Sequence, residues 1–313
     1  MPTTLPSESL ARDVARAVLG WPEADASRFT TGMAFFVYDV SHGSDRAVVR
    51  MGRPEQSGAL RQGQELMETL RPLGVPLPAI FATGEQQGVP YIVMERLAGT
   101  DLGHVLHELS PAGNRRVAEA VADAQLATAR SGQSTRFGYA ATPEQAPHDG
   151  WAGVIAAHID RSRRLITANG LFPLEVITDT ERLFAGHRAA IDAVAPTPFL
   201  HDTTTKNVIV SPAGTLSGIV DVDDLCYGDP RYAAALTATA MLGWDGAEDY
   251  VAAWLARIGL TRDALFEFYV ATFLLDFMAE HGTRFNGNEV ASTPEARERL
   301  SRLYQEALRR AAV

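Results

Sequence analysis

The chain has 313 residues, of which 46% are hydrophobic and 21% charged, enough for one large or two modest domains with a full apolar core. Its formal net charge of −10 argues against a nucleic-acid partner, because binding to phosphates requires basic patches. The same charge suits a cationic ligand, although a simple requirement for solubility explains it more economically.

Neither a membrane nor a disulfide is expected. The longest apolar stretch, around residues 232–244, is shorter than the roughly 20 residues that a membrane helix needs. The N-terminus lacks the basic and then apolar pattern of a signal peptide, so we expect a cytoplasmic protein. Cys226 is the only cysteine, which excludes an intrachain disulfide. The sequence leaves the oligomeric state open.

Hydrophobic periodicity predicts a β-rich unit at the N-terminal end. A helix over 10–19 precedes a hairpin of strands at 34–40 and 47–51, a polar helix over 57–73, and two strands at 79–82 and 91–94. This order of strand, strand, helix, strand, strand is that of the small lobe of a kinase. We therefore expect a nucleotide-binding lobe over residues 1–96.

From residue 97 onward the pattern is mainly helical. Segment 131–150 reads as a loop, and helices are expected over 116–129, 151–168, 230–241, 262–281 and 294–308. The sequence thus predicts an α+β fold with two lobes. The first has a small antiparallel sheet and one main helix, and the second, over 97–313, is mostly helical and holds the catalytic loop and the substrate pocket.

A polar run in the second lobe is typical of a phosphoryl-transfer site. His201 and Asp202 open it, Asn207 follows five residues after Asp202, and Asp221 ends an apolar strand fourteen residues after Asn207. An Asp and an Asn at this spacing, with a second Asp on the next hairpin, can place a base beside two oxygen ligands for Mg²⁺. The base would accept the proton of an attacking hydroxyl group.

The segment from residue 199 to 230 resembles the aminoglycoside phosphotransferase and choline kinase family, small-molecule relatives of the protein kinases. That family has His-any-Asp, four residues, Asn, an apolar hairpin, Ile-Asp with a second acid two positions on, and Gly-Asp-Pro. The matching residues are Asp202, Asn207, Asp221, Asp223 and Gly228-Asp229-Pro230. The resemblance implies that the first is the catalytic base, that the next three serve the metal, and that ATP and Mg²⁺ are the cofactors.

Two positions depart from the family pattern. The histidine of the family lies two residues before the aspartate, where this chain has Leu200, and His201 instead adjoins Asp202. Ala233 stands where the family commonly has a helix-borne aspartate. Because both positions lie outside the base and the metal ligands, we expect them to affect loop rigidity and rate more than the class of reaction.

The resemblance assigns phosphate binding to the third strand of the first lobe. The family lysine there is Arg50 in this chain, and arginine can also fork onto phosphate or carboxylate oxygens. Glu65 on the following helix is the predicted partner of Arg50, with Glu68 as its competitor. The alternative of an exposed strand-edge arginine and a solvated glutamate stays open.

Three further residues follow from the same resemblance. Gly32 lies where the loop that covers the phosphates belongs. Backbone groups around Glu95 and Leu97, at the end of the last strand of the first lobe, would bind adenine.

The helix over 262–281 carries the candidate substrate residues. It is mostly apolar, but Thr272, Asp276 and Glu280 recur at four-residue spacing and form one polar stripe. This stripe either faces water or lines a cationic pocket, as acidic residues of late helices do in aminoglycoside kinases.

These features predict an enzyme that transfers the γ-phosphoryl group of ATP to a hydroxyl of a small molecule. An aminoglycoside-like cationic acceptor, with a link to antibiotic resistance, is the first choice, and choline, homoserine, a macrolide or a sugar metabolite stay open. The rival is a nucleotide-binding pseudokinase, favoured by Arg50 and the shifted histidine but opposed by retention of Asp202, Asn207 and Asp221. A protein kinase fits less well, because no activation segment is recognisable.

Overall fold

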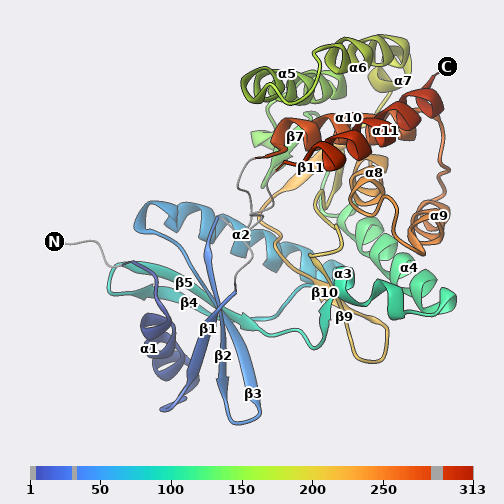
Figure 1. The fold of residues 1–313 in the computed structure, drawn as a ribbon. Helices are drawn as coiled ribbons and strands as arrows, with labels where there is room; N and C mark the ends of the chain where they lie inside the picture. The colour runs from blue at the N-terminus through green and yellow to red at the C-terminus, as the bar shows by residue number, and fades with distance from the viewer. Residues whose placement is uncertain (1–4, 30–33, 283–291, 313) are drawn as a thin grey trace.

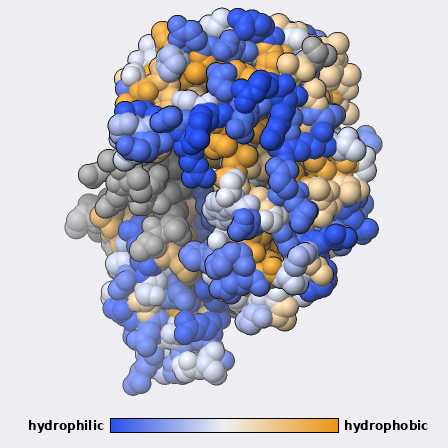
Figure 2. Space-filling view, turned by 45° about the vertical axis from the view of Figure 1, so that its right-hand side comes forward, coloured by the Kyte–Doolittle hydropathy of each residue, from blue (hydrophilic) through white to orange (hydrophobic). Residues whose placement is uncertain are grey.

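The computed structural model describes residues 5–29, 34–282 and 292–312. It has a small lobe built on an antiparallel sheet and a larger helical lobe, with the N-terminus on the first and the C-terminus on the second (Figure 1). The predicted α+β, two-lobed, kinase-like architecture is confirmed. Hydrophilic residues cover much of the face seen in Figure 2, with hydrophobic residues between them. Within the described residues, no helix combines the length and apolar character needed to cross a membrane.

Five antiparallel strands form the sheet of the small lobe, in the order β1-β2-β3-β5-β4. Strand β1 was not predicted, because its four residues, Asp-Ala-Ser-Arg, show no apolar alternation. The β4–β5 hairpin is longer than predicted, since Gln87 and Gly88 form its turn at positive φ angles and let pairing continue to the tip. The strands are β1 (Asp25–Arg28), β2 (Phe36–His42), β3 (Asp45–Met51), β4 (Ile80–Gln86) and β5 (Val89–Glu95).

Helix α1 (Glu8–Leu19) packs against one face of this sheet, and α2 (Ser57–Leu70) lies at the junction of the lobes (Figure 1). The buried side of α2 is shared between the two lobes. Leu60 packs with Phe35 of the small lobe, whereas Leu66 and Leu70 belong to an apolar cluster that includes Leu200 beside the catalytic loop. Helix α2 therefore couples the sheet of the first lobe to the polar loops of the second.

The larger lobe is organised around α10, which is buried on almost every side and packs against α5, α8 and α11. Because α10 is apolar along most of its length, the sequence predicted a buried helix at this position. Helices α6, α7 and α9 were not predicted. The helices are α3 (Leu102–Val105), α4 (Pro111–Thr128), α5 (Trp151–Asn169), α6 (Glu175–Gly186), α7 (Arg188–Asp192), α8 (Arg231–Ala240), α9 (Ala247–Arg257), α10 (Ala264–Glu280) and α11 (Pro294–Ala311).

Two three-stranded sheets, β10-β9-β6 and β7-β11-β8, hold the polar loops between them. The catalytic loop joins β8 to β9, and the loop after β10 carries Asp221. Gly99 before β6 must be glycine, because a Cβ there would lie 1.9 Å from the Val210 carbonyl oxygen. The strands are β6 (Thr100–Asp101), β7 (Gly138–Ala140), β8 (Thr197–Phe199), β9 (Val208–Val210), β10 (Leu216–Ile219) and β11 (Leu225–Gly228).

Candidate active site

A buried glutamine of α4 braces the catalytic loop. The Gln125 amide accepts a hydrogen bond from Leu200 N at 2.9 Å and donates to Leu200 O at 2.8 Å and to Thr203 Oγ1 at 3.1 Å. Buried polar side chains persist only when paired, so this amide fixes where the loop leaves β8. Gln125 was not predicted from the sequence, although a glutamine among the mostly apolar buried residues of α4 is a visible signal.

Asp202 is half-buried and is held by its neighbours in the loop. Thr204 Oγ1 donates to Asp202 Oδ1 at 2.6 Å, and Asn207 Nδ2 donates to the Asp202 carbonyl oxygen at 3.0 Å. The first contact orients the carboxylate. The second uses the amide nitrogen of Asn207 inside the loop, which leaves its oxygen as the atom suited to a cation.

The loop after β10 returns beside Asn207, since Val220 N donates to the Asn207 carbonyl oxygen at 2.9 Å. Asp221 then adopts a left-handed backbone with φ of 62°, an uncommon conformation for a residue other than glycine. Backbone strain of this kind is often found at functional sites.

The charge environment of Asp221 joins the two loops. Its side chain is 56% exposed, yet the protein surrounds it closely enough that desolvation raises its pKa. Arg50 acts against this rise, the charges of Asp223 and Asp202 add to it, and Lys206 opposes it. A carboxylate crowded by two others is a favourable position for a cation.

The oxygens of Asn207 and Asp221 fit Mg²⁺, which commonly takes one or two protein ligands and completes its shell with water and phosphate. Among the residues that the structure describes, no three or more His, Cys, Asp or Glu side chains are grouped to hold a metal. Asp223, the third predicted metal residue, is instead engaged by Arg50, and its role at a metal stays a prediction.

Arg50 of β3 is buried, with its side chain 8% exposed, and forks onto Asp223. Its Nη1 donates to Asp223 Oδ1 at 2.7 Å, its Nη2 contacts the other carboxylate oxygen, and Nη2 lies 3.5 Å from Asp221 Oδ1. The guanidinium carbon also lies 4.1 Å from the centre of the Phe35 ring. Arg50 is therefore not an exposed strand-edge residue.

The predicted pairing of Arg50 with Glu65 is wrong in this structure. Glu65 and Glu68 are exposed on α2, and the residue of α2 that faces the ion pair is Gly63, where a Cβ would lie 2.8 Å from Asp223 Oδ1. The helix thus brings a glycine to Asp223 and turns its acids outward. The alternative of a solvated glutamate is the one that the geometry favours for Glu65.

The other predicted nucleotide contacts are less defined. Gly32 lies outside the described residues. Glu95 N donates to Ala79 O at 2.8 Å and Glu95 Oε2 accepts from Ala79 N at 3.0 Å, while Leu97 O accepts from Arg96 Nη1 at 3.0 Å. Since those backbone groups are already used within the chain, adenine binding at Glu95 and Leu97 stays a prediction.

His201 turns away from the reacting end of Asp202 and faces Asp224. Its Nδ1 lies 3.3 Å from Asp224 Oδ1, and its ring meets that of Tyr139 edge to face at 4.9 Å between centroids. Burial raises the pKa of Asp224, against the opposing effect of His201. His201 is thus a packed loop residue.

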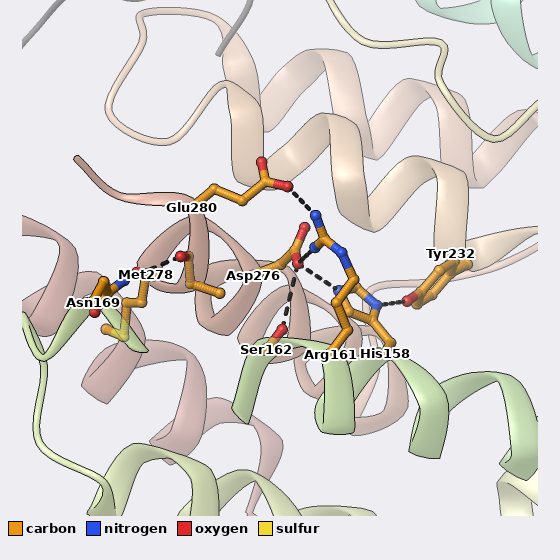
Figure 3. A network of polar contacts seen from close by, with 9 residues as sticks. His158, Arg161, Ser162, Asn169, Tyr232, Asp276, Met278 and Glu280 are labelled. Carbon is orange, nitrogen blue, oxygen red and sulfur yellow. Dashed lines mark hydrogen bonds and ion pairs between the residues drawn. The ribbon is translucent and has the colours of Figure 1, made fainter. Parts of the chain in front are cut away.

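The acidic stripe of α10 faces α5 (Figure 3). Arg161 of α5 contacts both Asp276 and Glu280, and His158 Nε2 lies 3.4 Å from Asp276 Oδ1. Desolvation alone would raise the pKa of Asp276, but hydrogen bonding and charge from His158 and the charge of Arg161 outweigh it and lower the pKa. These acids are therefore neutralised within the chain. This arrangement differs from both expected alternatives, a stripe that faces water and a stripe that lines a cationic pocket.

Asp229 is structural. Its Oδ1 accepts from Arg231 N at 3.0 Å at the start of α8, and its Oδ2 accepts from the hydroxyl of Tyr269 at 3.0 Å. Ala233, the position of a family aspartate, is buried in the core of the larger lobe.

Taken together, a strand-borne cation in a small antiparallel lobe and a carboxylate with two further side-chain oxygens on neighbouring loops of a helical lobe form the arrangement expected of a phosphotransferase of the kinase-like class. The sequence profile of the phosphotransferase enzyme family matches residues 25–268. The chain belongs to that family, and it is in class a small-molecule kinase. No protein with a curated description matches it.

Solved structures share the fold over nearly the whole chain. Aminoglycoside phosphotransferase APH(4)-Ia has a TM-score of 0.67 at 16% identity, with 97% of this chain and 100% of that one covered. Aminoglycoside phosphotransferase APH(2'')-Ib has a TM-score of 0.63 at 12% identity, with 98% and 100% covered. A candidate fructosamine-3-kinase from Haemophilus somnus 129PT has 0.59 at 13%, with 95% and 96% covered. At such identities the likeness concerns the fold alone.

Proposed function

We propose that this phosphotransferase moves the γ-phosphoryl group of ATP to a hydroxyl group of a small molecule. The observation that carries the proposal is the convergence of Asp202, Asn207 and Asp221, which joins a proton acceptor to two oxygen donors on adjacent loops. Structures of APH(4)-Ia variants hold ADP or AMP-PNP together with hygromycin B, which supports a nucleotide at the corresponding place.

Asp202 is the proposed base. Its carboxylate, oriented by Thr204, would accept the proton of the acceptor hydroxyl as the oxygen attacks phosphorus. Phosphoryl transfer needs little covalent help, so most of the rate would come from alignment and charge neutralisation.

Asn207 and Asp221 are the proposed metal ligands. Mg²⁺, when bound, would supply positive charge against the charge that develops on the transferred group. Arg50 has five N–H donors and spends part of them on Asp223, so it can also contact a phosphate oxygen.

One observation favours the rival, a nucleotide-binding pseudokinase. Arg50 and Asp223 already form an ion pair with each other, and Asp223 lies on the loop after β10 that also carries Asp221, here called the metal loop. A nucleotide phosphate that binds Arg50 would have to compete with this ion pair. Retention of Asp202, Asn207 and Asp221 still favours the enzyme.

The cationic acceptor predicted from the sequence relied on the acids Asp276 and Glu280. Because Arg161 contacts both, the proposal names only a hydroxyl acceptor at this point.

The test is Mg²⁺-dependent release of ADP from ATP across aminoglycosides, macrolides, choline, homoserine and simple sugars. Asp202→Ala serves as the inactive variant, and Asp245→Ala, in an exposed turn, as its matched control. We expect turnover with one class of acceptor that Asp202→Ala abolishes and Asp245→Ala retains. Mg·ATP binding without turnover of any acceptor would instead support the pseudokinase.

A further inference from the structure

A cavity of about 370 Å³ lies between the two lobes, beside the metal loop. Phe35, just before β2, and Gln62 of α2 line it from the first lobe, and Tyr139 of β7 and Gln145 line it from the second. Asp223 and Asp224 belong to the same lining. Arg50 contacts Asp223 and lies 3.5 Å from Asp221 Oδ1, so a compound in this cavity lies near the proposed transfer site.

Each acid of the cavity has a basic side chain of this chain beside it. Asp223 is forked by Arg50, and Asp224 lies 3.3 Å from His201. A cationic ligand would have to displace Arg50 to gain the carboxylate of Asp223, and a guanidinium left unpaired at a buried position is costly. The cavity therefore gives a positive charge on the ligand little advantage.

The remaining polar groups suit hydroxyls. Gln62 Nε2 donates to Gln145 Oε1 at 2.8 Å across the lobes. Since each amide has two N–H donors and one oxygen acceptor, the pair keeps both kinds of group for a ligand. Tyr139 is 40% exposed and adds an aromatic surface, against which the C–H face of a sugar ring can pack.

The volume indicates the size of the ligand. At 370 Å³ the cavity lies near the lower end of the roughly 300–1,000 Å³ of small-molecule sites, which suits a compound of one or two sugar rings. A compound with several amino-sugar rings is larger than this.

We propose that the cavity between α2 and β7 binds the phosphoryl acceptor and that this acceptor is an uncharged polyhydroxylated compound about the size of one or two sugar rings. This inference rests on the proposed function and names the substrate class of the same site. Gln62 and Gln145 are its specificity-determining residues.

The substrate test compares compounds matched in shape but not in charge. The probes are D-glucose against 2-amino-2-deoxy-D-glucose, with D-ribose and myo-inositol as further uncharged compounds and kanamycin as a cation of several rings. The readout is ADP release with Mg·ATP. We expect at least one uncharged compound to be phosphorylated with a kcat/KM about tenfold or more above that of every cationic probe.

The residue test uses the best uncharged probe. Gln62→Ala and Gln145→Ala should each raise KM about tenfold while kcat stays within about twofold, because they remove hydrogen bonds to the acceptor and leave the base in place. Gln64→Ala is the matched control, since Gln64 lies on the same helix and bonds to Glu68 outside the cavity. Its KM should equal that of the unaltered protein.

The outcomes separate this inference from the proposed function. If a cationic probe is preferred and Asp202→Ala abolishes its turnover, the proposed function stands and the uncharged acceptor is wrong. An unchanged KM in both Gln62→Ala and Gln145→Ala would likewise overturn the assignment of the cavity. If none of these probes is turned over but choline, homoserine or a macrolide is, the proposed function stands and the inference is wrong; if no acceptor of the wider panel is turned over, both fail.

Discussion

At the scale of single residues, the Arg50–Asp223 pair most clearly distinguishes this chain from the pattern expected of it. The arginine takes its carboxylate from the metal loop, whereas the sequence predicted a partner on α2. The pair thus links β3 directly to the loop that carries Asp221. A substitution of either residue should therefore affect the stability of both lobes.

A double-mutant cycle measures this link. We expect Arg50→Ala to lower the free energy of unfolding by about 1–2 kcal/mol, less than for a fully buried pair, because a third of the Asp223 side chain is exposed. Arg50→Ala with Asp223→Asn should cost less than the sum of the two single changes when urea unfolding is measured. Strict additivity would mean that the two side chains do not interact in solution.

We expect Asp221 to lower the stability of the metal-free fold, because its position is suited to metal binding. Desolvation and its acidic neighbours both disfavour an ionised aspartate here, whereas asparagine adopts the same left-handed backbone and carries no charge. Asp221→Asn should therefore raise Tm in the absence of metal and abolish the effect of Mg²⁺ on nucleotide affinity. A lower Tm, or an intact Mg²⁺ response, would argue against this account of Asp221.

At the scale of secondary-structure elements, α4 supports the catalytic loop through one buried amide. Gln125→Leu keeps a similar volume but leaves the Leu200 backbone N–H and C=O without their partner, which should cost about 1–3 kcal/mol of unfolding free energy. We also expect kcat to fall more than the affinity for ATP, because the loop carries Asp202. The same change at Gln64 on α2 serves as control, and equal behaviour of the two variants would contradict the bracing role.

The contact between α5 and α10 should depend on pH. The pKa of Asp276 is lowered in the folded protein, so its ionised form stabilises the fold above the ordinary value of 3.8, and this contribution is lost as pH falls through the lowered pKa. Relative to Asp276→Asn, the unaltered protein should be more stable at pH 7, and the difference should shrink below about pH 4 in urea titrations.

The neighbouring and exposed Asp160 provides the control for that titration. Asp160→Asn should show little difference from the unaltered protein at any pH. If the difference for Asp276→Asn stayed constant or grew on acidification, its carboxylate would not be the stabilising group.

At the scale of the whole molecule, local patterns predicted the architecture and the motif loops, because these depend on apolar periodicity and on residues close in sequence. The spacing of Asp202, Asn207 and Asp221 was sufficient to predict that the two loops lie side by side. Strand β1 and the short β7 gave no periodic signal, and they form only because neighbouring strands pair with them.

The partners of charged residues could not be predicted in the same way. Arg50 and Asp223 are 173 positions apart in sequence, and Arg161 lies more than a hundred positions before the acids that it contacts. Which acid meets which base depends on how α2 and α5 are rotated, and a helix pattern alone gives several equivalent choices. Glu65 was therefore a reasonable but wrong partner for Arg50.

The central claim is that Asp202 acts as the base of a phosphoryl transfer, and a single-turnover experiment tests it most directly. Protein in excess over γ-labelled ATP is mixed with Mg²⁺ and the best acceptor, and the labelled product is followed for the unaltered protein and for Asp202→Asn. We predict that Asp202→Asn slows transfer about 10²–10⁴-fold while the Kd of Mg·ATP stays within about twofold. Transfer at an undiminished rate in Asp202→Asn would contradict the account.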